Sequence, residues 1–138
     1  YMKAAKQGNA GAQNNLGYMY EHGEYVTKDY QKAYEWYMKA AKQGIRNAQS
    51  AIGYMYENGH YVTKDYQKAY EWYMKAAEQG NAIAHAKIGD MYRYGRHVNR
   101  NPQKAYEWYK KAAEKGDEKL REQLIEEVKR MIRLGELR

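Results

Sequence analysis

YVTKDYQKAYEWYMKAA occupies residues 25–41 and returns, without a single change, at residues 61–77. The shorter string YMKAAKQG begins at residue 1 and returns with few changes at residues 37, 73 and 109. The copies follow one another every 36 residues, and such a period is typical of proteins made of stacked helical repeats. This predicts three full repeats, 9–44, 45–80 and 81–116, preceded by the end of another repeat, 1–8, and followed by a different segment, 117–138. Because the chain starts inside a repeat, we expect it to be a piece of a longer array or an array whose beginning is missing.

Each repeat has the apolar spacing of two amphipathic helices. In the first helix of repeat one, apolar residues recur at helical intervals: Ala12, Leu16, Met19 and Tyr20. Gly23 breaks this helix, Asp29 is placed to cap the next one, and Gly44 is placed to end it. The second helix has one apolar face: Ala33, Trp36, Tyr37, Ala40 and Ala41. We expect the tryptophan on that face, and its equivalent Trp72, to be a large buried ring.

Two further features predict how the helices pack and where the stack ends. Gly17, Gly53 and Gly89 lie inside the first helices, where glycine costs about 1 kcal/mol, so a neighbouring helix backbone is expected to approach closely there. Ile125 takes the corresponding place in the segment 117–138. That segment also carries apolar residues at four-residue spacing: Leu120, Leu124, Val128 and Ile132. It is therefore predicted to be a C-terminal capping helix with this apolar face turned inward.

The repeat follows the pattern A-x3-L-G-x2-Y-x2-G-x-x-V-x2-D-x2-K-A-x2-W-x2-K-A-A-x2-G. In repeat one the matching residues are Ala12, Leu16, Gly17, Tyr20, Gly23, Val26, Asp29, Lys32, Ala33, Trp36, Lys39, Ala40, Ala41 and Gly44. This pattern closely resembles the Sel-one-like repeat, a relative of the tetratricopeptide repeat. The resemblance implies an all-α fold, an α-solenoid in which antiparallel helix pairs form a right-handed superhelix. It also implies a non-catalytic adaptor that assembles protein complexes, often in bacterial signalling, secretion or host contact.

The chain departs from that family in the loop between the two helices of a repeat. A second loop glycine is usual there, but this chain has Tyr25, Tyr61 and His97. Asn101 also replaces the usual aspartate before the second helix of repeat three, where Pro102 follows as the first helical residue. We therefore expect a different loop conformation at the three non-glycine positions.

The sequence offers little for catalysis, metal binding or membrane insertion. It has no cysteine, and Ser50 is its only serine, without a recognisable base beside it. Its histidines are scattered, with none of the four-residue spacing of a helical metal pair: His22, His60, His85 and His97. No run of about 18 apolar residues could span a membrane. We therefore predict no enzymatic activity, no cofactor, no metal site and no transmembrane segment.

Stacked helix pairs form a concave groove that is lined mainly by their first helices. The exposed side of those helices is predicted to bind a protein or peptide through Asn14, Tyr18, His22, Tyr54, Asn58, Asp90, Arg93 and Tyr94. Repeats one and two differ at nine of 36 positions, most of them on or beside the first helix. That pattern fits a constant frame with a variable inner surface, and it fits drift after duplication equally well. A site elsewhere would fall on the outer tyrosines Tyr34, Tyr70 and Tyr106.

Two alternatives to a protein-binding adaptor remain. The net charge of +7 and the 17 tyrosines fit a single-stranded nucleic-acid binder, in which basic side chains contact phosphates and rings stack on bases. We favour the adaptor because Glu21, Glu57 and Asp90 fall in the predicted groove, where they would repel phosphates. The near-identity of repeats one and two also fits an engineered array without a native partner.

Overall fold

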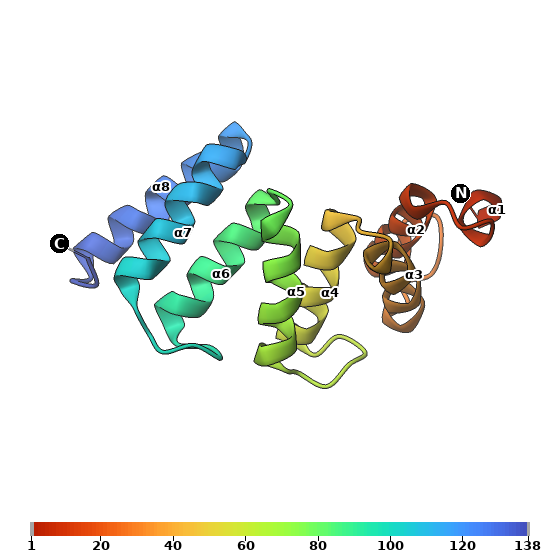
Figure 1. The fold of residues 1–138 in the computed structure, drawn as a ribbon, viewed down its shortest axis with the longest axis horizontal. Coiled ribbons are helices and arrows are strands. Elements are labelled where there is room, and N and C mark those ends of the chain that lie inside the picture. The colour runs from red at the N-terminus through yellow and green to blue at the C-terminus, as the bar shows by residue number, and fades with distance from the viewer. Residues whose placement is uncertain (1, 138) are drawn as a thin grey trace. The chain divides into compact units, whose positions relative to one another are not determined.

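The computed structural model describes residues 2–137, a range that contains eight α-helices and no strand (Figure 1). In chain order the helices are α1 (Met2–Lys6), α2 (Ala10–His22), α3 (Tyr30–Lys42), α4 (Arg46–Asn58), α5 (Tyr66–Glu78), α6 (Ala82–Tyr94), α7 (Pro102–Lys115) and α8 (Glu118–Arg133). The all-α prediction is confirmed, with two helices per repeat and a final helix in the segment after repeat three. The chain forms two compact units, one running to Ala76 and the other starting at Ala77.

In the first unit, α2 packs against α3, and α3 packs in turn against α4. The backbone N–H of Asp29 donates to the carbonyl of Tyr20 at 2.9 Å, which places the start of α3 beside the end of α2 and makes the pair antiparallel. The Asp29 carboxylate then accepts a hydrogen bond from the Lys32 N–H at 3.1 Å, as expected for a helix cap. A buried cluster joins α3 to α4: Ala33, Tyr37, Ala40, Ala41, Ala48, Ile52 and Met55.

In the first unit a tyrosine ring, rather than a helix backbone, makes the close approach to the glycines of the first helices, whereas at Gly89 of the second unit the Ala105 carbonyl also comes within 3.3 Å of an added Cβ atom. A Cβ atom added to Gly17 would lie 2.5 Å from Cδ1 of Tyr37, and one added to Gly53 would lie 2.7 Å from Cδ1 of Tyr73. The close approach predicted from the sequence is thus present in the first unit, but a side chain makes it. The missing Cβ leaves the space that the ring of the second helix fills.

The large buried ring of each second helix is therefore tyrosine, and the expectation for tryptophan is wrong. Tyr73 is fully buried, whereas Trp72 is half-buried and Lys75 Nζ lies 4.5 Å from the centre of its ring. Trp36 has the same arrangement with Lys39 at 4.7 Å. An indole under an ammonium group gains a cation–π attraction while it keeps one edge in water.

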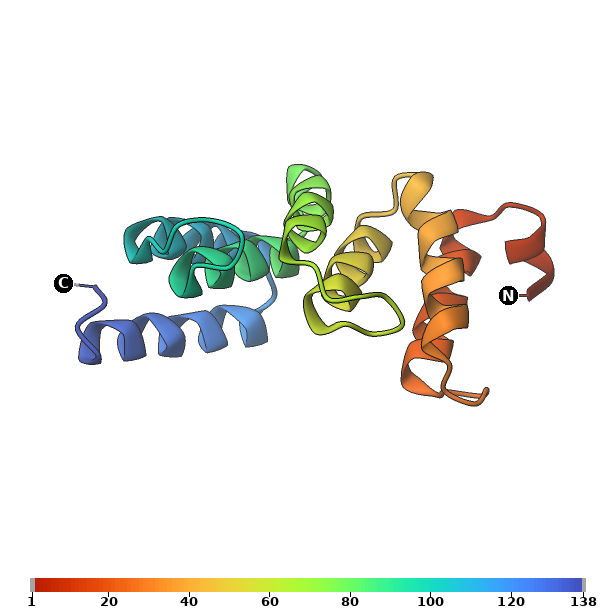
Figure 2. The same cartoon turned by 90° about the horizontal axis from the view of Figure 1, so that it is seen from below.

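The second unit contains the α6–α7 pair and the capping helix α8, which runs alongside them in both views (Figure 1, Figure 2). As predicted, Asn101 caps α7, and Pro102 is its first residue. The core of this unit holds Ala105, Tyr109, Ala112, Leu124 and Met131.

The buried face of α8 drifts away from the predicted stripe. Ile132 was expected to face inward with Leu124, but it is 51% exposed, while Met131 is fully buried. Four-residue steps turn a helix by about 400°, so residues at that spacing move around the axis by about 40° per step. Met131, seven residues after Leu124, stays on the inner face instead.

The loops keep the left-handed backbone conformation although they lack the second glycine. The φ angles of Tyr25, Tyr61 and His97 are 62°, 67° and 64°, a region that costs a residue with a Cβ atom roughly 1–2 kcal/mol. The expectation of a different loop conformation is therefore wrong. Backbone hydrogen bonds on both sides of Tyr25, from Glu24 to Met19 and from Asp29 to Tyr20, hold the first of these loops.

Candidate functional site

The first helices present tyrosine rings on the side opposite their buried face. In the first unit, Tyr18 of α2 is 47% exposed and Tyr54 of α4, at the equivalent position, is 38% exposed. Leu16 and Ile52 of the same helices are buried. In the second unit, Tyr94 at the end of α6 is 54% exposed. Large rings with this much exposed surface are typical contact residues of protein interfaces.

Histidines accompany both tyrosines of the first unit. The Tyr18 ring lies 4.1 Å from the ring of His22, which is one helical turn further along α2. The Tyr54 ring meets His60 edge-on at 5.6 Å, and His60 stacks on Tyr30 at 4.3 Å. Sequence reasoning missed His60 and Tyr30, because a loop residue and a helix start come together here only through the packing of α3 against α4.

The two predicted asparagines, Asn14 and Asn58, differ in how accessible their side chains are to a partner. Asn58 is exposed and its side-chain amide donates to the Tyr54 carbonyl at 2.9 Å. Asn14 is half-buried, and among the described residues its Oδ1 atom has no hydrogen-bond partner. This oxygen is buried, so a bound segment would reach it only if the surrounding side chains moved, and Asn58 is the more accessible of the two amides.

Glu21 and Glu57 were expected to line an exposed groove, but both accept hydrogen bonds from buried tyrosines instead. The Tyr37 hydroxyl donates to Glu21 and the Tyr73 hydroxyl donates to Glu57, each at 2.8 Å. Glu57 is buried as a result. Burial, followed by the negative charge of Glu21, raises the pKa of Tyr37 above its ordinary value. These carboxylates hold the buried rings in place over the glycines.

Repeat three has different residues at the positions of these tyrosines and glutamates. Asp90 occupies the position of Tyr18 and Tyr54, and it accepts a hydrogen bond from the Tyr109 hydroxyl. Arg93 occupies the position of the two glutamates. Arg93 was predicted to contact a partner, but only 3% of it is exposed.

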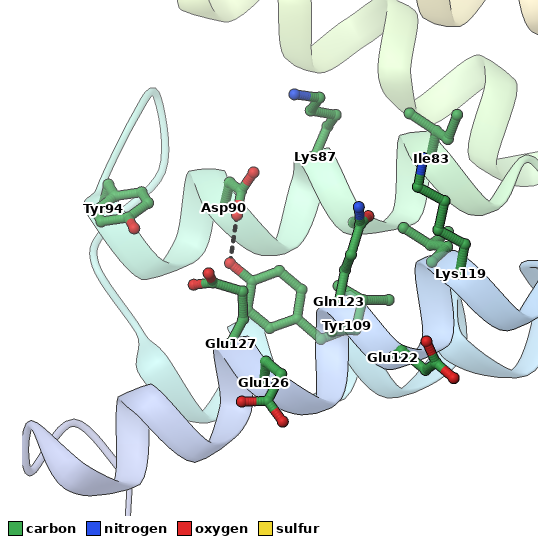
Figure 3. Close-up of a pocket in the computed structure, with 13 residues that line it drawn as sticks. Ile83, Lys87, Asp90, Tyr94, Tyr109, Lys119, Glu122, Gln123, Glu126 and Glu127 are labelled. Atoms are coloured by element: carbon green, nitrogen blue, oxygen red, sulfur yellow. Dashed lines mark hydrogen bonds between the residues drawn. The ribbon is translucent and has the colours of Figure 1, made fainter.

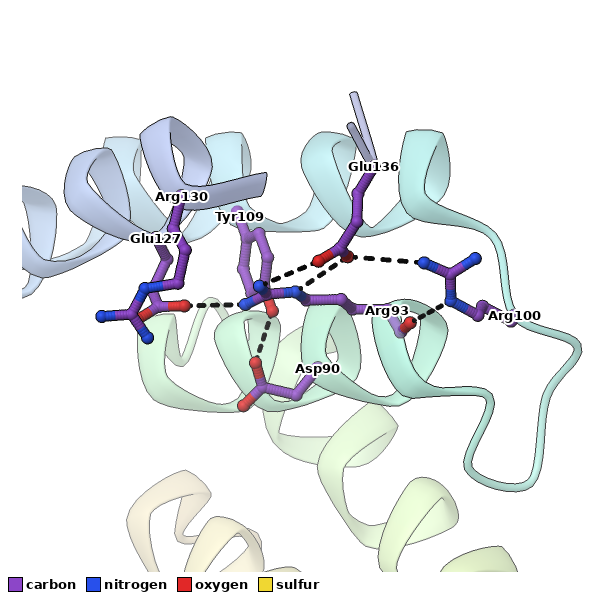
Figure 4. Close-up of polar contacts among 7 residues, drawn as sticks. All are labelled: Asp90, Arg93, Arg100, Tyr109, Glu127, Arg130 and Glu136. Carbon is purple, nitrogen blue, oxygen red and sulfur yellow. Dashed lines mark hydrogen bonds and ion pairs between the residues drawn. The ribbon is translucent and has the colours of Figure 1, made fainter. Parts of the chain in front are cut away.

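Arg93 instead connects α6 to the capping segment, as Figure 4 shows. Its Nη1 atom lies 2.7 Å from Glu127, and its Nε and Nη2 atoms lie 3.1 and 3.2 Å from the two oxygens of Glu136. Arg100 adds a longer contact to Glu136 at 3.6 Å. Burial alone would lower the pKa of Arg93, but the hydrogen bonds that Arg93 donates to Glu136 and Glu127 raise it above its ordinary value. Arg93 is therefore a structural residue of the second unit and does not belong to the candidate site.

Tyr94 keeps its predicted exposure between two arginines. The guanidinium carbons of Arg93 and Arg96 each lie 5.1 Å from the centre of its ring. Tyr34, named above as an outer tyrosine, packs between repeats instead, because its hydroxyl lies 3.0 Å from that of Tyr56. Tyr70 and Tyr106 are half-buried.

Within residues 2–137, no group of three or more histidine, cysteine, aspartate or glutamate side chains is placed to hold a metal ion. His85 is buried, and its Nδ1 atom lies 2.8 Å from the carbonyl of Asn81. None of the helices within these residues has both the length and the apolar composition needed to span a membrane.

A stack of antiparallel helix pairs with one exposed face per first helix defines a helical-repeat protein. The chain belongs to the Sel1 repeat family, whose model matches residues 10–45, 46–81 and 82–117. These boundaries differ by one residue from the repeats defined above. Sel1 repeat proteins generally mediate protein–protein interaction and are generally non-catalytic.

Solved structures with the same fold come from several bacteria. A protective antigen of uropathogenic Escherichia coli with an SLR fold is 42% identical over 84% of this chain, with a TM-score of 0.79. A Sel1 repeat protein from Oxalobacter formigenes is 41% identical over 90%, with a TM-score of 0.81. Helicobacter pylori cysteine rich protein B is 27% identical over 86%, with a TM-score of 0.66, and 90% of its own chain is covered. The present chain spans only 25% of the first protein and 51% of the second. A search of curated proteins gave no match.

Proposed function

We propose that this chain is a non-catalytic adaptor that binds a protein or peptide segment through the exposed sides of α2, α4 and α6. The observation that carries the proposal is the exposure of Tyr18, Tyr54 and Tyr94 on helices whose opposite sides are core. Tyrosine provides a large contact area with little loss of side-chain entropy and ends in a hydroxyl that can form a hydrogen bond. The expected contacts are Asn14, Tyr18, His22, Tyr54, Asn58, Asp90 and Tyr94.

The neighbours of the lysines support a protein partner over a nucleic acid. Many lysine ammonium groups lie over rings of their own repeat, such as Lys32 over Tyr20 at 5.4 Å and Lys68 over Tyr56 at 5.5 Å. Both the cation and the ring face would have to leave this arrangement to contact a phosphate and a base. If the chain did bind a nucleic acid through phosphate contacts, its affinity would fall steeply as salt is added, and this salt dependence distinguishes the two functions.

The test uses a random dodecapeptide library displayed on phage and selected on the full chain. We expect enriched peptides whose affinity falls by about tenfold or more when Tyr18 and Tyr54 are both changed to alanine, because hot-spot aromatic residues carry most of an interface's energy. The matched control changes Glu35 and Glu71, which are exposed on α3 and α5, to alanine. If the peptides bind both variants equally well, the exposed tyrosines do not form the site.

A further inference from the structure

The second unit contains a groove between α6 and α8, with Tyr109 of α7 at its base (Figure 3). Its volume is about 900 Å³, near the upper end of the range of roughly 300–1,000 Å³ for ligand sites. Ala86, Leu120 and Leu124 supply apolar surface, and Ile83 lies at the edge with 55% of its surface exposed. We call this the α6–α8 groove. It has room for one or more side chains of a bound segment.

The charge of the α6–α8 groove is opposite to that of the chain. Its lining includes four carboxylates and two ammonium groups: Asp90, Glu122, Glu126, Glu127, Lys87 and Lys119. The whole chain has a net charge of +7. The groove is therefore an acidic site on a basic protein, and it would favour a cationic group that the rest of the surface repels.

Two of the carboxylates are suited to contact a ligand. Glu122 and Glu126 are four residues apart on α8, so they lie on one side of the helix, and both are exposed. Lys129 Nζ lies 3.5 Å from Glu126, but both side chains are at least 60% exposed, so water weakens this pair. Glu127 is engaged by Arg93, and Asp90 accepts the Tyr109 hydroxyl. Figure 3 shows Glu122 and Glu126 on the side of α8 that is turned away from α6, so a bound cation would meet them at the outer rim of the groove.

We propose that the α6–α8 groove binds a short peptide segment that places an aliphatic side chain over Ile83, Ala86 and Leu120 and a lysine or arginine against Glu122 and Glu126. This inference rests on the proposed protein-binding function and narrows the partner to a basic, partly apolar segment. Tyr94 lies in the same lining and extends the contact toward the end of α6. The lining favours a basic over an acidic segment, because its carboxylates outnumber its ammonium groups by four to two.

The experiment measures the affinity of peptides selected from the dodecapeptide library by fluorescence anisotropy with the full chain. The groove variant is Glu122→Lys combined with Glu126→Lys. The control, Glu35→Lys combined with Glu71→Lys, changes the net charge by the same amount on exposed sites of α3 and α5. A third variant, Ile83→Ser, tests the apolar contact alone. Circular dichroism verifies that each variant is folded.

We expect selection to enrich peptides that combine an aliphatic residue with lysine or arginine. Their affinity should fall by about tenfold or more in the groove variant and in Ile83→Ser, and by less than about twofold in the control. Peptides that lack basic residues, or that bind the groove variant as well as the control, would overturn this inference. The proposed function would still stand if those peptides required Tyr18 and Tyr54. Failure to select any peptide would contradict both.

Self-association is a separate outcome of the same set of variants. If sedimentation shows that the parent chain dimerises and that the groove variant is monomeric, the occupant is a second copy of this chain and the peptide proposal is wrong. A monomeric parent chain that binds the selected basic peptides supports it.

Discussion

Nη1 of Arg93 lies 2.7 Å from Oε2 of Glu127, and this ion pair connects the last repeat to the capping helix. Repeats one and two have glutamate at the position of Arg93, where it would repel Glu127 and Glu136. The capping helix thus fits repeat three and would be unfavourable on the other two.

Replacing Arg93 with methionine should destabilise the second unit by about 3–5 kcal/mol, because it leaves the acceptors of Glu136 without their buried partner. Urea unfolding followed by far-ultraviolet circular dichroism measures the loss. Arg100→Met serves as the control, since the Arg100 side chain is largely exposed and its contact to Glu136 is longer. Equal stability of the two variants would show that the Arg93 contacts do not hold the cap.

Acid should weaken the same contacts. The hydrogen bond from Arg93 lowers the pKa of Glu136 below its ordinary value of 4.5. The unfolded chain therefore takes up this proton at a higher pH than the folded chain does, so the contribution to stability is complete above about pH 4.5 and is lost as the pH falls below it. Urea titrations at several pH values between about 3 and 6 should show this loss in the parent chain. The Arg93→Met variant should lack that part of the pH dependence, and an unchanged dependence would contradict the assignment.

Gly53→Ala should destabilise the chain by about 1–3 kcal/mol, although alanine is the better helix former. The added Cβ would lie 2.7 Å from Tyr73, a ring that is fully buried and held by Glu57, so it has nowhere to move. Gly11→Ala is a matched control, because Gly11 is an exposed helical glycine whose added Cβ would have an ordinary contact at 3.4 Å. It should be neutral or stabilising by up to about 1 kcal/mol. Thermal melts that shift in the same direction for both variants would disprove the close approach.

Tyr25→Gly should stabilise the chain by about 0.5–1 kcal/mol, because glycine adopts the left-handed conformation without steric strain. The Tyr25 ring is 95% exposed, so its removal sacrifices almost no packing. Tyr25→Ala is the control, since alanine keeps the Cβ atom and the strain. A melting temperature that rises equally in both variants would mean that the tyrosine ring, and not the backbone, is unfavourable.

The repeats, the helix caps and the position of the tight glycine contact could be predicted from the sequence, because each depends on residues within one repeat. The choice of Tyr37 over Trp36 as the buried ring could not, since adjacent residues differ by about 100° around a helix and both fell on the same apolar face. The burial of Arg93 depends on a different segment, α8. The exchange of a glutamate for arginine in repeat three, together with acidic residues in the cap, is a sequence signal that could have revealed it.

The left-handed loops were predicted incorrectly for a related reason. The residue types at Tyr25, Tyr61 and His97 favour another backbone conformation, but the helices on either side determine where the loop must begin and end. The exposed rings of Tyr18 and Tyr54 were predicted correctly, because solvent exposure on a helix follows directly from its buried stripe.

The most direct test of binding through the exposed sides of α2, α4 and α6 is an amide chemical-shift map of the isotope-labelled full chain, titrated with a selected peptide. The proposed function predicts the largest shifts around Tyr18, Tyr54, Asp90 and Tyr94, with small shifts on the exposed sides of α3, α5 and α7. Shifts concentrated on those second helices, with the first helices unchanged, would contradict it.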